Sequence, residues 1–179
     1  ALPIYGDPSG REPDGRLYSW PRRPTDLSDR QGVPTWPIDP HYKADLFTFA
    51  RVNWYSTRYS DAWLTDYPTS DLNISFRLPD LTTIRTNPDP VIVKFTDPHL
   101  ADYPFTYMVE VSTLEFQDDE VPALRKYLLN GGFLMVDDFW GQQAWDNFRL
   151  AMAAKDDKDG HDGPFPDREP VDLPLDPPL

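Results

Sequence analysis

The chain has 179 residues, 17 basic and 30 acidic side chains for a formal net charge of −13, and no cysteine. A charge of this size and sign repels nucleic acid and anionic lipid, so we expect no nucleic-acid partner. The lack of cysteine excludes disulfides, thiolate catalysis and cysteine metal sites. The length suits one domain with a hydrophobic core. No stretch approaches the ~20 apolar residues of a membrane-spanning helix.

The first residue is Ala1, as in a mature protein whose secretory signal ended at a small-residue cleavage site. A recombinant chain can begin in the same way. We expect the periplasm or cell envelope of a bacterium, after signal-peptide cleavage before Ala1, and the lack of cysteine is compatible with that compartment. The expected partners are other protein subunits, among them a membrane complex contacted from its periplasmic face.

Residues 1–45 hold eight of the 21 prolines and few aliphatic residues. Such a segment cannot form its own core, so we interpret it as an extended Pro-rich arm that wraps its own domain or a partner. Proline lowers the entropy lost on docking, and aromatic side chains supply contact area. The aromatic side chains predicted to bind a partner are Tyr5, Tyr18, Trp20, Trp36 and Tyr42 in this arm, together with Trp140 later in the chain.

Residues 46–154 carry the periodic signals of an α/β domain. Residues 46–54 are predicted to form a strand. Residues 71–78 alternate strictly between apolar and polar side chains, which favours a strand, although Ser70 or Asp71 could cap a short helix that ends near Pro79. Pattern alone favours the strand.

The second half of this region predicts a βαβ unit. Residues 91–95 form a continuous apolar run with one lysine, typical of a strand buried on both faces. Strand 105–111, helix 118–130 and strand 133–137 then follow in order, which implies parallel strands joined by a right-handed crossover. A last helix is predicted over 142–154.

Residues 155–179 hold six prolines, three basic and eight acidic side chains. This composition is typical of a solvated acidic tail. The alternative interpretation is a truncated continuation of the domain.

The stretch GGFLMVDDFWG, from Gly131 to Gly141, predicts a helix end, a buried strand and then a loop. Ligands of open α/β sheets bind at the carboxyl ends of strands. Asp137 and Asp138 therefore occupy a position where functional residues are expected.

Several short motifs resemble the bacterial domain of unknown function 4159, over residues 46 to about 179. The motifs are Phe49-Ala50-Arg51-Val52, Trp63-Leu64-Thr65-Asp66-Tyr67-Pro68, Asp71-Leu72-Asn73, Leu81-Thr82, Tyr103-Pro104-Phe105, Leu124-Arg125-Lys126-Tyr127-Leu128, GGFLMVDDFWG and Pro166-Asp167-Arg168-Glu169-Pro170.

This family is similar to the class I glutamine amidotransferase-like and flavodoxin-like proteins and often occurs in exported bacterial proteins. The resemblance implies a three-layer α/β sandwich with a mainly parallel sheet, flanked here by the Pro-rich arms. It also favours a helix over residues 70–78, against the alternation. The chain departs from the family in the acidic loop at 155–163 and in ending where such domains usually continue through further strands.

Acidic residues stand where the amidotransferases carry their catalytic cysteine. The candidate catalytic residues are Asp137, Asp138 and Asp66, as nucleophile or general base. Asp97, Asp137 and Asp138 are candidate ligands of Ca²⁺ or Mg²⁺, which take oxygen ligands. We expect Asp137 and Asp138 to shape a turn or cap a helix rather than to act in catalysis.

Other catalytic motifs are missing from the sequence: there is no phosphate-binding Gly-rich loop and no Ser-centred nucleophile elbow. His41, His99 and His161 form no paired zinc motif and are expected at the surface. We expect no cofactor.

The sequence favours a non-catalytic interaction subunit of a bacterial envelope assembly. The alternative is a carboxylate-dependent hydrolase or carbohydrate-binding protein that uses Asp137 or Asp138, and a weaker alternative is a divalent-cation-binding domain.

Overall fold

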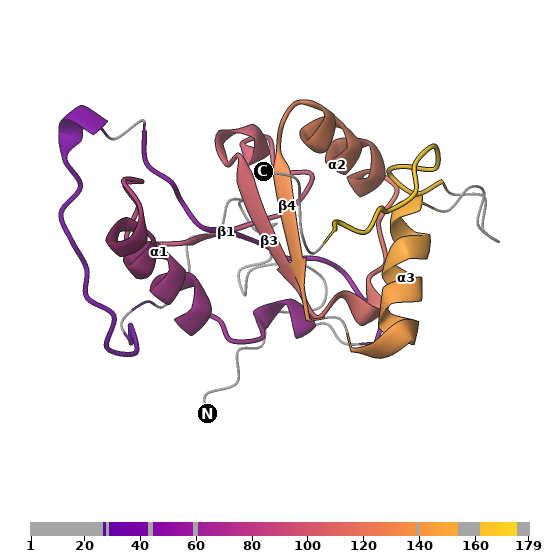
Figure 1. Ribbon diagram of the computed structural model, residues 1–179, viewed down its shortest axis with the longest axis horizontal. Helices are drawn as coiled ribbons and strands as arrows, with labels where there is room; N and C mark the ends of the chain where they lie inside the picture. The colour runs from indigo at the N-terminus through magenta and orange to yellow at the C-terminus, as the bar shows by residue number, and fades with distance from the viewer. Residues whose placement is uncertain are drawn as a thin grey trace, which may run out of the picture.

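The computed structural model describes residue 27 and residues 29–42, 45–58, 61–138, 140–153 and 162–174. They form an α/β fold with one four-stranded parallel sheet and three α-helices, and Figure 1 shows α1 on one side of the sheet and α2 and α3 on the other. The strands are β1 (Ala50–Val52), β2 (Val91–Val93), β3 (Phe105–Val109) and β4 (Phe133–Asp137), in the order β2-β1-β3-β4. The helices are α1 (Thr69–Leu81), α2 (Glu120–Leu129) and α3 (Gly141–Ala153).

The predicted βαβ unit is confirmed by β3, α2 and β4. The two strands are parallel, and their register runs from Phe105 opposite Phe133 to Val109 opposite Asp137. The helices predicted over 118–130 and 142–154 are also confirmed, each within two residues of its expected bounds. Strong helical periodicity therefore located the second half of the domain correctly.

For residues 71–78 the alternation favoured a strand and the family resemblance favoured a helix; the structure confirms the helix, because these residues lie within α1. The helix buries Asp71, Leu72 and Ser75, which share one face at helical spacing. Pro79 lies inside the helix and cannot donate a hydrogen bond to the Ser75 carbonyl one turn earlier. The Thr86 hydroxyl donates to that carbonyl instead, at 2.7 Å. A group from outside the helix thus replaces the missing donor.

The other predicted strands are shorter in the structure. β1 covers only the middle of residues 46–54, although Phe47 still forms an isolated parallel bridge with Thr86. β3 ends at Val109 because Glu110 has a left-handed backbone (φ 58°), and a 3-10 turn follows over Val111–Thr113. A left-handed residue cannot continue a strand.

The main hydrophobic core lies between the sheet and α2. It contains fully buried side chains from the strands and from α2, among them Val52, Met108 and Leu124. The opposite face of the sheet carries a second, smaller cluster, in which Phe49, Tyr107 and Val109 are buried. Side chains that alternate along the strands therefore divide between two faces that are covered to different extents.

Strand β4 was predicted to be buried, and this prediction is wrong for one of its faces. Phe133 is 59% exposed and Met135 43% exposed, whereas Leu134 and Val136 between them are half-buried against the main core. β4 stands at the end of the sheet, and no helix in the described part of the chain buries its outer face.

The region after α3 was predicted to be a solvated tail, which is wrong for residues 163–165. Gly163 and Pro164 are buried, and the Phe165 N–H donates to the Met152 carbonyl. Arg125 of α2 holds this segment through the Pro164 carbonyl and Asp167.

Among helices built from described residues, none is long and apolar enough to span a membrane.

Candidate functional site

Three predicted catalytic residues meet at the carboxyl end of the sheet. Asp137 is the last residue of β4, and Asp138 follows it with a left-handed backbone (φ 59°). Asp66 precedes the helix α1 and is also left-handed (φ 59°). The Asp138 N–H donates to Asp137 Oδ1 at 2.8 Å, and we call Asp137 and the left-handed Asp138 at this strand end the carboxylate turn.

The Asp138 carboxyl lies within the electrostatic influence of the other two acids. The pKa of Asp138 is raised above its ordinary value by burial first, and then by the negative charges of Asp137 and Asp66. The fold thus brings an acid from before α1 near two acids from the end of β4.

Tyr107 lies beneath these carboxylates. Its hydroxyl donates to Asp137 Oδ2 over a long 3.4 Å. Burial raises the Tyr107 pKa to about 12, and the Asp137 charge adds to the effect. The phenol therefore stays protonated at neutral pH and serves as a hydrogen-bond donor to the carboxylate.

Arg51 is a fully buried cation on the same face of the sheet. Its Nη2 lies 2.6 Å from Asp71 Oδ2, and Nε also donates to Asp71, so the pair links β1 to α1. Nη1 donates to the carbonyl oxygens of Trp63 and Thr65. Arg51 thereby fixes the loop that carries Asp66.

The rings of Tyr67 and Tyr107 lie near the Arg51 guanidinium, with ring centres 5.8 and 5.1 Å from its Cζ. Burial raises the Tyr67 pKa, and its hydroxyl is buried with no hydrogen-bond partner among the described residues. Sequence reasoning did not assign Arg51, Tyr67 or Tyr107 to the site. The available signal was a single arginine inside the apolar run FTFARV.

Asp97 was predicted as a metal ligand together with Asp137 and Asp138, but the structure places it elsewhere. It is buried in the loop after β2, where its Oδ1 accepts the His99 N–H. Its other oxygen has no partner in the described structure. The described residues contain no group of three acidic, histidine or cysteine side chains arranged to hold a metal ion. The predicted ligand set is therefore not assembled.

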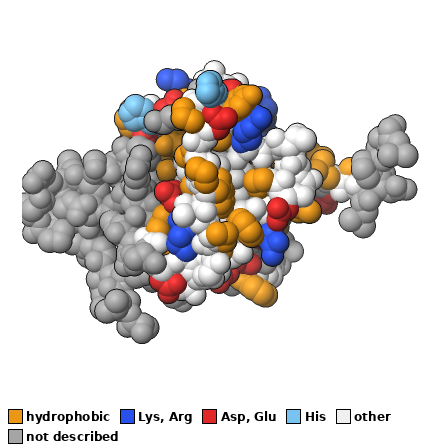
Figure 2. All heavy atoms as spheres, turned by 90° about the vertical axis from the view of Figure 1, so that its left-hand side faces the viewer, with side chains coloured by type: hydrophobic (Ala, Val, Ile, Leu, Met, Phe, Trp, Pro, Cys, Tyr) orange, Lys and Arg blue, Asp and Glu red, His pale blue; other side chains and the backbone are white. Residues whose placement is uncertain are grey.

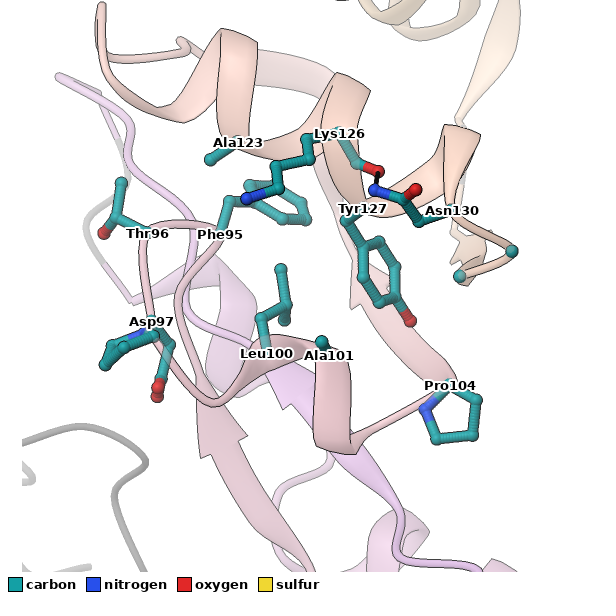
Figure 3. Close-up of a pocket in the computed structure, with 13 residues that line it drawn as sticks. Phe95, Thr96, Asp97, Leu100, Ala101, Pro104, Ala123, Lys126, Tyr127 and Asn130 are labelled. Atoms are coloured by element: carbon teal, nitrogen blue, oxygen red, sulfur yellow. Dashed lines mark hydrogen bonds between the residues drawn. The ribbon is translucent and has the colours of Figure 1, made fainter.

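Asp97 instead lines a pocket of about 310 Å³ between its loop and the end of α2 (Figure 3). The walls are mainly apolar and include Phe95, Leu100 and Tyr127. Figure 3 shows the Asp97 carboxylate directed away from Lys126, the basic residue of the lining. The pocket also contains Pro104 and the glycines before β4, so it lies near the amino end of β3 and β4, opposite the carboxylate turn.

The predicted partner-binding aromatics fall into three groups: two that contact this chain, one that is exposed, and three that lie outside the described residues. Trp36 packs on this chain, since its indole N–H donates to the Thr86 carbonyl and its ring lies 6.0 Å from Phe76. The ring of Tyr42, 39% exposed, lies 3.8 Å from the Arg85 guanidinium carbon. Trp140 is 72% exposed. The remaining predicted residues, Tyr5, Tyr18 and Trp20, lie outside the described residues.

Figure 2 shows the α1 side of the molecule, where hydrophobic side chains lie among charged ones and histidines lie at the surface. His41 and His99 are both exposed, which confirms the prediction for these two. His161 lies outside the described residues. Neither described histidine joins the carboxylate turn.

A row of aromatic rings crosses the sheet on the Arg51 face and reaches its edge. Phe47 and Phe105 have ring centres 5.5 Å apart, and Phe105 stacks on Phe133 at 5.7 Å with an interplanar angle of 13°. Phe47 and Phe105 are half-buried, whereas Phe133 is 59% exposed. We call Phe133, Met135 and Asp137, the three residues of β4 on this face, the β4 surface.

The sequence matches the family described as Domain of unknown function (DUF4159) over residues 48–179. Because the match covers most of the chain, the protein belongs to this family. The matched residues include every strand of the sheet and the segment that packs on α2 and α3. No curated protein matches the chain.

Proposed function

We propose that this chain is a non-catalytic interaction subunit of a bacterial cell-envelope assembly, and that it binds its protein partner through the β4 surface. One observation carries this proposal: an apolar strand at the end of a parallel sheet exposes 59% of Phe133 and 43% of Met135. Parallel sheets are normally covered on both faces, so an open face on such a sheet requires an explanation.

The sequence of β4 supports the same conclusion. Edge strands of isolated proteins usually carry lysine, proline or a bulge that prevents pairing with other chains. Residues 133–136 are Phe, Leu, Met and Val, and contain none of these features. Exposed apolar clusters at such positions mark interaction surfaces. We therefore assign the open half of the sheet to a partner.

The envelope location and the fold relationship are parts of the same proposal. The envelope location rests on membership of this family, whose domains often occur in exported bacterial proteins. Helices on both sides of a parallel sheet agree with an amidotransferase-like, flavodoxin-like sandwich. On that resemblance, Asp137 and Asp138 stand where an amidotransferase carries its catalytic cysteine, which supports a non-catalytic role.

The experiment compares variants in the native bacterium. Replacing Phe133 and Met135 together by lysine places two charges on the β4 surface. Leu129 and Leu150, which are 52% and 53% exposed on α2 and α3, provide the matched double-lysine control. We expect the chain to migrate with a larger particle on native gels in the wild type and the control, but alone in the Phe133→Lys/Met135→Lys variant. Migration with the particle in all three would contradict the proposal.

A second candidate function rests on the three carboxylates. The raised pKa of Asp138 beside Asp137 and Asp66 is the arrangement that general acid catalysis uses, so a carboxylate-dependent hydrolase or carbohydrate-binding role remains the alternative proposal. Its test is hydrolysis of a panel of glycoside and ester substrates by the wild type and the Asp138→Asn variant. Turnover that the substitution removes would favour this alternative.

The divalent-cation role is tested by melting temperature. A Ca²⁺ or Mg²⁺ ion that binds only the folded chain raises this temperature, by an amount that grows with the logarithm of the ion concentration above its dissociation constant. Equal melting temperatures with and without millimolar Ca²⁺ or Mg²⁺ would remove this alternative.

A further inference from the structure

We propose that the partner binds β4 as an added, extended strand that carries alternating apolar residues and, beside Asp137, an arginine or lysine. This inference rests on the proposed function and specifies the chemistry of the partner. It assigns three features of the partner: an extended backbone, an apolar side chain at every second position, and a positive charge at the end near the carboxylate turn.

The extended backbone follows from the free edge of β4. This strand pairs with β3 on one side and is the last strand of the described sheet on the other. A strand edge presents N–H and C=O groups in a fixed spacing, which an extended segment satisfies by strand addition. β4 has five residues, which is about the length of an average strand, so a partner strand of ordinary length can pair with it.

The apolar alternation follows from the face that β4 exposes. Phe133 and Met135 project on the same face, and the residues of an added strand directly beside them project there too. Apolar side chains at those two positions would extend the row of rings formed by Phe47, Phe105 and Phe133. Polar side chains there would leave the exposed rings in water.

The positive charge follows from the third residue on this face. Asp137 is exposed and lies beside Asp138, whose pKa is raised partly by the charge of Asp66. Arg51, the nearby cation, is fully buried and already paired with Asp71. A basic residue next to Asp137 would offset the repulsion among the three carboxylates, because opposite charges on neighbouring strands attract.

A second copy of the chain fits this surface less well. Each copy has a net charge of −13, so two copies repel each other. Each copy would also bring its own three carboxylates to the shared edge rather than a basic residue. The charge on the surface therefore favours a different, basic protein segment.

The test uses labelled heptapeptides of the form Xaa-Thr-Val-Thr-Val-Thr-Xaa with the complete chain. The same residue at both ends places one Xaa beside Asp137 in either strand direction, and Xaa is arginine, glutamine or glutamate. Fluorescence anisotropy gives each dissociation constant at low and high salt. A fourth peptide keeps the arginine side chains but has alternate backbone amides methylated, which blocks strand pairing.

We expect the arginine peptide to bind about fivefold more tightly than the glutamine peptide, as for a favourable surface ion pair, and the glutamate peptide to bind most weakly. High salt should reduce these ratios. In the Asp137→Asn/Asp138→Asn variant, the ratio of the arginine-peptide affinity to the glutamine-peptide affinity should fall towards one. The methylated peptide should lose binding.

Four outcomes would overturn the inference. Equal affinities of the wild type for the arginine and glutamine peptides would remove the charge assignment, and undiminished binding of the methylated peptide would remove strand addition. A concentration-dependent dimer that Phe133→Lys/Met135→Lys abolishes would assign the surface to a second copy. If no peptide binds although that variant still leaves the native particle, the inference fails while the proposed function stands.

Discussion

The two halves of the sheet on the Arg51 face differ in how they are covered. Over β1, the helix α1 packs closely and the Arg51–Asp71 pair is fully buried beneath it. Over β4, the apolar side chains of Phe133 and Met135 remain exposed. One half therefore contributes its side chains to the stability of the fold, and the other has its side chains available for binding. This difference predicts that substitutions beneath α1 will lower the free energy of unfolding, whereas substitutions on the β4 surface will weaken association with a partner.

The largest effect is expected for Arg51→Met in the covered half. The substitution leaves Asp71 buried without its partner, which costs about 3–5 kcal/mol in the free energy of unfolding. Urea denaturation measures this loss. Arg30→Met is the control, because the Arg30–Asp89 pair is partly exposed and should contribute below about 1 kcal/mol. A loss below about 1 kcal/mol for Arg51→Met would show that this pair does not hold α1 on the sheet.

The second prediction compares two phenylalanines that both pack against Phe105. Phe49 is fully buried and Phe133 is 59% exposed, and their ring centres lie 5.8 and 5.7 Å from that of Phe105. Phe49→Ala should cost about 3–5 kcal/mol in the free energy of unfolding, because it leaves a cavity, and Phe133→Ala below about 1 kcal/mol. Urea denaturation of both variants gives the comparison. Equal losses would mean that Phe133 serves the fold rather than a partner.

A third, intermediate effect is expected at Thr86. Thr86→Val removes the hydroxyl that donates to the Ser75 carbonyl, and leaving a buried acceptor without a donor costs about 1–3 kcal/mol. In the Pro79→Ala background, the new backbone N–H can donate to the same carbonyl, so Thr86→Val should cost less there. A double-mutant cycle by thermal denaturation measures the difference. Equal costs in both backgrounds would contradict this account of the proline in α1.

The sequence predicted the order of the elements from residue 91 onward because those signals are local. The Gly131-Gly132 pair and the spacing of Leu124 and Leu128 mark α2 without reference to the rest of the chain. The helix α1 was not predicted by its own pattern, because its buried face is set by a contact between Asp71 and Arg51, twenty residues earlier. Local alternation cannot report such a tertiary contact.

The candidate site was predicted in part for the same reason. The position of Asp137 and Asp138 at a strand end followed from an apolar run and the residues after it. The proximity of Asp66 to Asp138 depends on how β1, β3 and β4 are ordered, which no spacing in the sequence encodes. The exposure of Phe133 was missed because an apolar run does not reveal whether a helix covers it.

The smallest effect concerns the pH dependence of stability at Asp138. Its pKa is raised in the folded chain, so the ionised carboxylate slightly destabilises the fold above that raised pKa. Asp138→Asn should therefore increase the free energy of unfolding by less than about 0.5 kcal/mol at pH 7. The gain should disappear as the pH falls below the ordinary aspartate pKa of 3.8, where the wild-type carboxyl is protonated in both states. A gain that persists below that pH would contradict the electrostatic origin.

The most direct test of the central claim is hydrogen–deuterium exchange at residues 133–137, measured in the isolated chain and in its native particle. If a partner strand binds the free edge of β4, amide hydrogens that exchange in the isolated chain will be protected in the particle. Protection over α1, which is already covered, should change little. Equal exchange of residues 133–137 in both samples would contradict the assignment of β4 to a partner.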